Sequence, residues 1–554
     1  MIMGGCAAPA IRFLGDLPVL FNSLQFLVFF PIVTLVYFVI PKRAKHLWLL
    51  AASYYFYMCW NARYALLILT STVVTYLSGL LMDRVRHGAA GCGPTAGSGP
   101  TAGSGPSAGC GPTAGGGPSA GGGPSAGAVE RATRARMKWI VAGSFIINLG
   151  ILFFFKYFNF TMRCVEMLSN LLHIQFHAPT FDVLLPVGIS FYTFQALSYT
   201  MDVYRGDIYA ERNFIRYALF VSFFPQLVAG PIERSRNLLR QLAEPKKFNY
   251  DQAREGLLLM LWGFFLKIVM ADRIAIFVDT VYGDYNTYGG WYIIVATLLF
   301  AAQVYCDFSG YSTIAMGTAK ILGVNLMENF NAPYLATSVA AFWRNWHISL
   351  TSWFKDYLYI PLGGNRKGMA RKQLNKMIVF LVSGLWHGAE LSYVLWGGIN
   401  GLYQVLGECL QPLKRRAVKG LGLNPDSLGH RLAQMAVTFL LVDFSWLFFR
   451  AASIGDALRM LSSAFSVRNP WILVDGSLYK CGLDSANFQL MLICIGLLLF
   501  ADICKRRGIR LRAVILAQDG WFRWLFIAAS VLAILLFGKW GPSFDKASFI
   551  YFQF

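Results

Sequence analysis

The sequence has few charged residues: they make up 14% of its 554 residues, against about 25% in soluble domains. Hydrophobic residues make up 56%, and the mean hydropathy is +0.49. This composition excludes an ordinary soluble domain and predicts a protein that crosses a membrane several times. The net charge of +21 does not point to nucleic acid, because the basic residues stand in short clusters between apolar stretches, as they do in cytoplasmic loops.

Several motifs of enzyme chemistry are also missing. The ten cysteines show no paired short spacing of the kind that builds a zinc site, so we predict buried thiols and no metal. The sequence contains no Walker-type phosphate loop, no zinc-protease His-Glu pattern and no serine-hydrolase elbow. Residues 1–18 lack the basic start and apolar core of a cleavable signal, and we expect them to form an N-terminal tail.

A low-complexity segment divides the chain. Residues 93–127 repeat Gly-Pro-Thr/Ser-Ala-Gly-x with a period of six and carry no charge or large side chain, so they cannot build a core. Collagen is excluded because Gly does not recur at every third position. We therefore predict a flexible cytoplasmic linker over 88–128, which separates N-terminal transmembrane helices at 19–87 from a larger transmembrane body at 129–554.

Apolar stretches of membrane-spanning character recur along the chain. They lie at about 19–40, 47–60, 64–82, 139–155, 184–203, 214–228, 256–281, 291–305, 377–410, 432–449, 488–504 and 522–537. They predict an all-α polytopic membrane protein with about 10–12 transmembrane helices. Basic clusters at 234–247, 366–376, 414–419 and 505–512 assign those loops to the cytoplasm.

The stretch 333–368 differs from these spans, because polar residues such as Arg344, His347 and Asp356 interrupt its apolar residues. Polar segments at membrane depth persist only where protein or a water-filled cavity surrounds them. We therefore predict re-entrant or interfacial helices that line an internal chamber.

His387 is the main candidate for chemistry. Cytoplasmic clusters bracket 377–410, so two short spans fit there, and His387 lies eleven residues beyond Lys376. A helical rise of about 1.5 Å per residue places it about 16 Å into a hydrocarbon core about 30 Å thick. An ionisable residue at that depth indicates a functional site, although a neutral imidazole bonded to a backbone carbonyl is the alternative. The neighbouring Gly384, Trp386 and Gly388 favour function, because they allow close approach and stacking of a bound group.

Two further residues stand in unusual surroundings. His347 lies beside Trp346 and near Arg344, and it has either a structural role or one in orienting a substrate. Asp307 lies in an apolar neighbourhood and must be paired, protonated or exposed to a cavity, with a helix-packing ion pair as the alternative to function. The remaining histidines are expected to be solvated or interfacial: His46, His87, His173, His177 and His430.

Several motifs combine into one pattern. They are 185–194, 202–206, 224–225 with 229–231, 307–312, 328–330, 342–366, 386–388, 448–451 and 551–554. With them the sequence resembles the membrane-bound O-acyltransferase family, in particular its branch of alginate O-acetyltransferase membrane subunits and D-alanyl transfer proteins of lipoteichoic acid. The Gly-Pro repeat is extra, and Asn345 stands where the alginate branch tends to carry a second Arg.

The resemblance implies a function for the body at 129–554. His387 would be the catalytic residue and His347 a second active-site histidine, with Trp386, Trp346, Arg344 and Asp307 as supporting candidates. No permanently bound cofactor is implied. An acyl thioester, either acetyl-CoA or an acyl carrier protein, would enter from the cytoplasm. The acyl group, most simply acetyl, would pass through a partner protein to hydroxyls of an extracytoplasmic polysaccharide, in the cytoplasmic membrane of a bacterium.

Two alternatives remain open from the sequence. The first keeps the fold but transfers D-alanine from a carrier protein to a teichoic acid. The second, from another class, is a proton-coupled transporter or flippase that uses His387 and Asp307 as a relay. Transporters often contain two related halves, and this sequence shows no second copy of its motif-bearing region.

Overall fold

The structure is a computed structural model that describes residues 20–90, 126–181, 185–228, 230–539 and 550. Within these ranges every regular element is a helix, which confirms the all-α prediction. The predicted tail at 1–18 lies outside the described residues, as do residues 91–125 of the predicted linker and the motif at 551–554.

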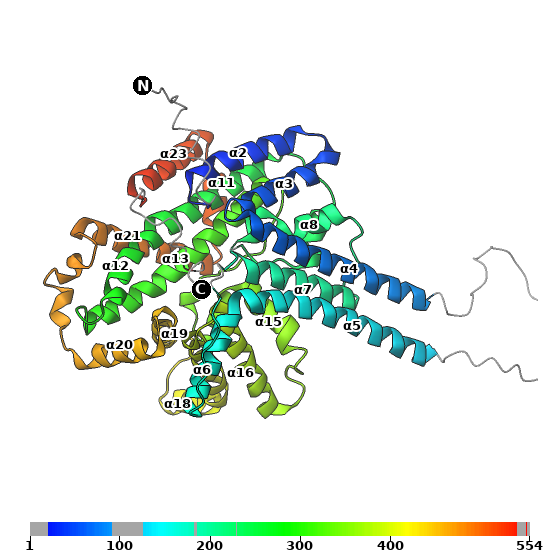
Figure 1. The fold of residues 1–554 in the computed structure, drawn as a ribbon. Helices are drawn as coiled ribbons and strands as arrows, with labels where there is room; N and C mark the ends of the chain where they lie inside the picture. The colour runs from blue at the N-terminus through cyan, green and yellow to red at the C-terminus, as the bar shows by residue number, and fades with distance from the viewer. Residues whose placement is uncertain (1–19, 91–125, 182–184, 229, 540–549, 551–554) are drawn as a thin grey trace, which may run out of the picture.

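The N-terminal helices form a layer at one side of the molecule (Figure 1). Its members are α2 (Leu24–Val39), α3 (Lys45–Met58), α4 (Ala65–Ala90), α5 (Ala126–Leu152) and α7 (Ile189–Arg205). Helices α4, α5 and α7 pack together, and the ends of α4 and α5 that flank the low-complexity segment project from the body. A π-helical turn, η3 (Phe153–Tyr157), joins α5 to α6 (Phe158–Leu171) without a break.

The centre of the protein is a pair of tightly packed helices. Here α11 (Tyr250–Phe264) runs beside the long α13 (Trp291–Ile321), with the π-helical turn η4 (Phe265–Ala271) and α12 (Asp272–Gly283) following α11. The two backbones approach so closely that a Cβ added at Gly263 would stand 2.7 Å from the carbonyl oxygen of Gly310. Small residues at such contacts are typical of helix packing in membranes.

The C-terminal part supplies the elements nearest the candidate site. They are the short α14 (Val339–Asn345), α15 (Ile348–Phe354) and π-helical η6 (Lys355–Tyr359), then α16 (Gly368–His387), α17 (Leu391–Cys409), α18 (Gln411–Gly420), α19 (Leu428–Arg450), α20 (Ile454–Ser466), α21 (Ser485–Arg506) and α23 (Gly520–Phe537). The two short spans predicted at 377–410 form the helices α16 and α17, which are not among the candidate membrane spans of the described residues. The polar stretch 333–368 forms short helices that pack against longer ones, and none of its residues lines the pocket described below; that these helices are re-entrant or interfacial and line a chamber stays a prediction.

Among the described residues, six helical segments are long and apolar enough to cross a membrane. They are Ala62–Gly88, Glu130–Leu171, Trp291–Ile321, Leu428–Arg450, Ser485–Arg506 and Gly520–Phe537. Two of the predicted crossings form shorter apolar helices, Leu24–Val39 and Phe214–Leu227. The protein is therefore polytopic, whereas the total of about 10–12 crossings stays a prediction.

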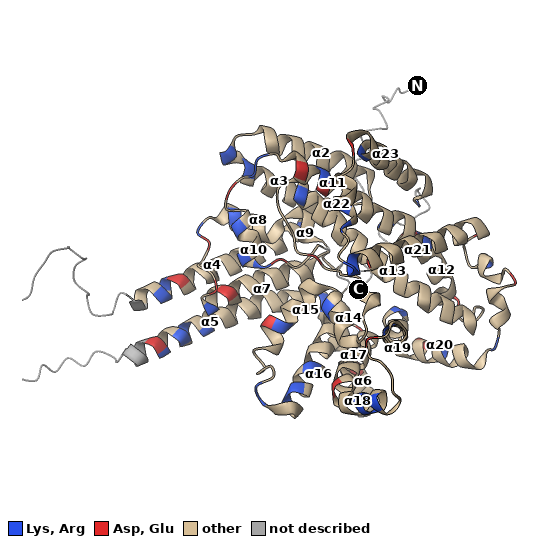
Figure 2. Cartoon of the chain, turned by 180° about the vertical axis from the view of Figure 1, so that it is seen from behind, with Lys and Arg blue, Asp and Glu red and all other residues tan. Residues whose placement is uncertain are grey.

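The basic residues lie mainly at helix ends (Figure 2). They gather at the turn between α2 and α3, at the projecting ends of α4 and α5, and at the start of α16, on the same side of the molecule. This arrangement is the one that the positive-inside rule predicts for the cytoplasmic face. The start of α16 lies among these basic residues, and His387 lies buried at the other end of the helix; which face is cytoplasmic stays a prediction.

Candidate active site

A pocket lies beside the C-terminal end of α16, with a cavity volume of about 50 Å³. It is lined by Lys156, Leu185, Pro186, Val187, Gly188, Ile189, Ser190, Phe191, Val228, Trp386 and His387. The lining thus comes from the α5–α6 junction, the start of α7 and the end of α16. A polar space of this size holds a few water molecules or a small reacting group.

His387 is the last residue of α16, and its side chain is buried among aromatic rings. The imidazole centroid lies 4.9 Å from Trp386, 5.2 Å from Trp396 and 5.5 Å from Phe449. All three rings present an edge or face at a steep angle to the imidazole, so they restrict its rotation. His387 is also one of the residues that line the pocket.

His347 stands at the start of α15 in a strained backbone conformation. Its φ of 43° and ψ of 54° fall in the left-handed region, which non-glycine residues rarely occupy. Asn329 holds the turn in place: its backbone carbonyl accepts from Ile348 N–H at 2.9 Å, and its side chain bonds to Ser312 Oγ on α13 at 3.1 Å. Such backbone strain persists only where the surrounding structure fixes it, and it is frequent at functional sites.

The Trp386 ring contacts both histidines. Its centroid lies 5.9 Å from His347 and 4.9 Å from His387, and Phe191 of α7 packs edge-on against it at 5.2 Å. His347 is further covered by Phe308 of α13 at 4.6 Å. The structure therefore brings His387, His347 and Trp386 into one buried cluster.

The other supporting candidates lie apart from this cluster. Trp346 packs into the aromatic core behind the site, with its ring 5.2 Å from Trp446. Arg344 is exposed at the end of α14, because it points away from the face that carries Trp343. Asp307 forms a buried ion pair with Lys267 at 2.6 Å, which is the helix-packing alternative left open by the sequence.

Lys156 belongs to the pocket although the sequence analysis did not single it out. Its ammonium group donates to the carbonyl oxygens of Trp386 at 2.7 Å and His387 at 3.3 Å, and to Ser190 Oγ at 3.5 Å. The signal was present: Lys156 follows Phe153-Phe154-Phe155, and a cation directly after such an apolar run is unusual in a membrane helix.

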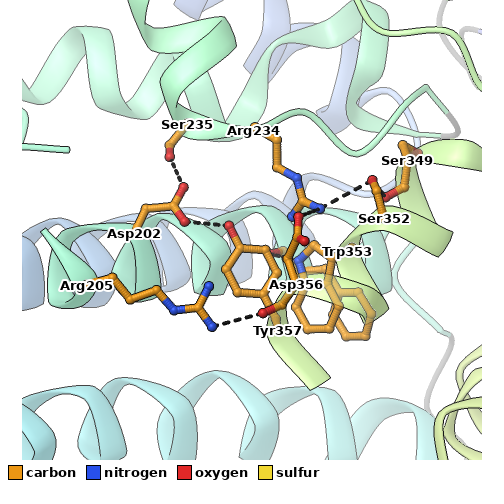
Figure 3. A network of polar contacts seen from close by, with 10 residues as sticks. Asp202, Arg205, Arg234, Ser235, Ser349, Ser352, Trp353, Asp356 and Tyr357 are labelled. Atoms are coloured by element: carbon orange, nitrogen blue, oxygen red, sulfur yellow. Dashed lines mark hydrogen bonds and ion pairs between the residues drawn. The ribbon is translucent and has the colours of Figure 1, made fainter. Parts of the chain in front are cut away.

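A polar network lies farther along α7 and α15 (Figure 3). Asp202, near the end of α7, accepts hydrogen bonds from Ser235 and Tyr357, while Arg234 forms an ion pair with Asp356 at 3.0 Å. Because Tyr357 and Asp356 lie in η6, directly after α15, the network ties this segment to α7. It thereby anchors the helix that begins at His347.

The contact between α16 and α17 leaves no space for side chains near His387. A Cβ added at Gly384 would stand 2.2 Å from the carbonyl oxygen of Tyr393, and one at Gly397 would stand 2.3 Å from that of Phe380. Glycine at these two positions therefore sets how closely Trp396 approaches His387. Among the described residues, the site included, no group of three or more His, Cys, Asp or Glu side chains is placed to hold a metal ion.

Comparison with known proteins agrees with this architecture. The sequence model of the membrane-bound O-acyltransferase family matches residues 211–417. The chain is 35% identical to the probable alginate O-acetylase AlgI of Pseudomonas syringae pv. tomato over 80% of its own length and 75% of that protein. The chain therefore belongs to the membrane-bound O-acyltransferase family, and it is an O-acyltransferase embedded in a membrane by several helices.

Two further relatives differ in their named activities. The peptidoglycan O-acetyltransferase of Helicobacter pylori is 29% identical over 82% of this chain and 81% of that protein. The teichoic acid D-alanyltransferase of Bacillus subtilis is 26% identical over 57% of this chain and 79% of that protein. Both acetyl and D-alanyl transfer thus occur among the relatives.

Proposed function

We propose that the protein moves an acetyl group from a cytoplasmic thioester toward hydroxyls of an extracytoplasmic polysaccharide, through a partner protein, in a bacterial cytoplasmic membrane. The observation that carries this proposal is the burial of His387 in the pocket wall at the end of a helix whose start is basic. Acetyl-CoA or an acyl carrier protein would supply the thioester. The relatives named as O-acetylases cover more of this chain than the named D-alanyltransferase does.

The proposed reaction at His387 is the first acyl transfer, and the partner protein completes the transfer to the polysaccharide. The neutral imidazole takes the proton of the acceptor hydroxyl as its oxygen attacks the thioester carbonyl. The new C–O bond forms, the C–S bond breaks, and the imidazolium gives its proton to the leaving thiolate, which yields the free thiol and restores the neutral imidazole. General-base catalysis of this kind contributes about 10²–10⁴ in rate. His347, which also contacts Trp386, would orient the reacting groups.

Substitution of His387 tests the proposal directly. We expect His387→Ala to lower polysaccharide O-acetylation about 10²-fold or more, because the general base is lost. The measurement is mass spectrometry of cell-surface glycans from a deletion strain that carries each variant, at matched membrane levels of the protein. The matched control is His430→Ala, since His430 lies at the start of α19 and bonds to Gln434.

Two results would count against the proposal. Normal acetylation in the His387→Ala strain would exclude His387 as the base. Loss of alanyl groups instead of acetyl groups from the deletion strain would replace acetyl with D-alanyl transfer. Family membership gives the transporter alternative no support.

A further inference from the structure

The last turn of α16 ends in carbonyl groups that need partners from outside the helix, as every helix end does. The carbonyl of Gly384 accepts from the N–H of Gly388, just past the helix end. The next three carbonyls, of Leu385, Trp386 and His387, accept from side chains of another segment of the chain.

The donors are two consecutive residues of the π-helical turn η3. The Tyr157 hydroxyl donates to Leu385 O at 3.0 Å, and the Lys156 ammonium donates to Trp386 O at 2.7 Å and His387 O at 3.3 Å. Single π-helical turns are rare and are frequent at functional sites. Here the turn presents two neighbouring side chains to one helix end.

The chemistry of lysine matches this place in two ways. An ammonium group has three donors and no acceptor, and Lys156 has three oxygen partners: the two carbonyls and Ser190 Oγ. A positive charge is also favourable at the C-terminal end of a helix, where the backbone dipoles leave a partial negative charge. Lys156 thus links α16, the start of α7 and the α5–α6 junction around the pocket.

We propose that Lys156, assisted by Tyr157, is a positioning residue that sets the place of the His387 imidazole in the pocket. This inference rests on the proposed function of His387. Lys156 acts through the backbone of residues 386–387, so its loss shifts the base relative to the bound thioester and hydroxyl. A displacement of about 1 Å at a reacting group can cost about 10²-fold in rate.

A second link between the same parts of the chain serves as a control. Arg163 of α6 forms an ion pair with Glu390, three residues after His387, at 2.6 Å. Both side chains are about half exposed, at 54% and 47%. This pair joins α6 to the segment after His387 but lies outside the pocket lining, so Arg163→Gln removes a tether without touching the carbonyls of the α16 end.

The experiment compares Lys156→Met, Lys156→Arg, Tyr157→Phe, Arg163→Gln and His387→Ala in the full-length protein. Each variant is expressed in the deletion strain, and surface O-acetyl content is measured by mass spectrometry at matched membrane levels. The thermal midpoint in detergent is measured in parallel. We expect Lys156→Met to lose at least about tenfold in acetylation and Tyr157→Phe about two- to fivefold, with Arg163→Gln unchanged. Lys156→Arg should recover part of the loss, because a guanidinium also donates to two carbonyls.

Each contrary outcome has one meaning. Lys156→Met within about twofold of wild type, or no more impaired than Arg163→Gln, would overturn the inference. So would a loss that merely follows the fall in thermal midpoint, or a failure of Lys156→Arg to exceed Lys156→Met. Full acetylation in His387→Ala would instead refute the proposed function, whereas loss in His387→Ala with normal Lys156→Met would refute only the positioning role.

Discussion

Two lysines within apolar helices, Lys156 and Lys267, stand in similar backbone surroundings but have different kinds of partner: neutral oxygens for Lys156 and carboxylates for Lys267. Both lie in π-helical turns that continue a long helix, Phe153–Tyr157 and Phe265–Ala271. Lys267 is almost fully buried between two carboxylates, at 2.8 Å from Asp272 and 2.6 Å from Asp307. Lys156 has carbonyl and hydroxyl partners, and the described part of the chain places no carboxylate within ion-pairing distance of it.

This difference in partners indicates that Lys267 has a role in helix packing, whereas Lys156 has a role in the candidate site. The charge of Lys267 is balanced within η4, α12 and α13, none of which lines the pocket, and it holds these helices together. The charge of Lys156 faces a helix end and a cavity that also contains His387. A lysine in a membrane helix therefore indicates a functional site more strongly when its partners are neutral and a pocket adjoins it.

The largest expected effect is on folding, from Lys267→Met. This substitution leaves two buried carboxylates without their cation, and breaking a buried ion pair typically costs about 3–5 kcal/mol. We expect a low membrane level of the protein and a thermal midpoint in detergent far below that of wild type. A midpoint close to wild type would show that the packing role assigned to Lys267 is wrong.

The next effect is that of Lys156→Met on stability, and it should be smaller than the effect on activity described above. Loss of charge-assisted hydrogen bonds costs about 1.5–3 kcal/mol, and the pocket lets water reach the carbonyls that are left. We expect about 1–2 kcal/mol in the free energy of unfolding, read as a modest fall in thermal midpoint. A fall as large as that of Lys267→Met would erase the contrast between the two lysines.

A smaller effect is expected when the whole buried ion cluster is neutralised. The triple variant Lys267→Met, Asp272→Asn, Asp307→Asn removes the cation and both charges that needed it. Neutralising all three groups together avoids the uncompensated buried charge that makes removal of one partner so costly. We expect the thermal midpoint to return most of the way to wild type, with acetylation retained. If acetylation stays absent while the midpoint recovers, Asp307 belongs to the catalytic machinery after all.

The smallest effect on stability is expected at a surface ion pair, Asp456 with Arg459, whose loss gives the lower limit against which the two buried lysines are compared. Hydrogen bonds from Ser453, Arg459 and Tyr285 lower the pKa of Asp456 to about 2. Because the pKa of this carboxyl is lower in the folded protein than its ordinary value, the ionised carboxylate stabilises the fold at pH values above that ordinary pKa. This stabilisation is lost as the pH falls from about 4 to about 2. We expect Asp456→Asn to cost at most about 1 kcal/mol near neutral pH, because exposed pairs are screened. The difference in midpoint from wild type should shrink as the pH is lowered toward 3.

The sequence allowed two parts of the site to be found. His387 and His347 were identified because ionisable residues in apolar or motif-rich surroundings are rare, and the structure places both beside Trp386. Their catalytic roles stay predictions. The all-helical fold and the pair of helices around residue 388 also followed from apolar periodicity and basic loops, since these depend only on local composition.

Other parts of the site could not be found in this way. Arg344 was grouped with His347 by proximity in sequence, yet helix geometry directs it to the surface. Lys156 was overlooked because its partners lie 230 and 231 residues away, and they are backbone carbonyls that leave no trace in residue identity. The strained φ of His347 depends on Asn329 and Ser312, whose contact with each other exists only in the folded chain.

The π-helical turn between α5 and α6 has a consequence for how the chain tolerates changes in length. Such a turn holds one residue more than an α-helix of the same rise, so it behaves like a single inserted residue. Deleting one residue from Phe153–Tyr157 would restore a regular helix and leave the phase of α6 relative to α5 nearly unchanged, because the π-helical turn already accommodates the extra residue. The helix would stay long enough to cross the membrane, but it would lose the wider turn that presents Lys156 and Tyr157 side by side to the end of α16.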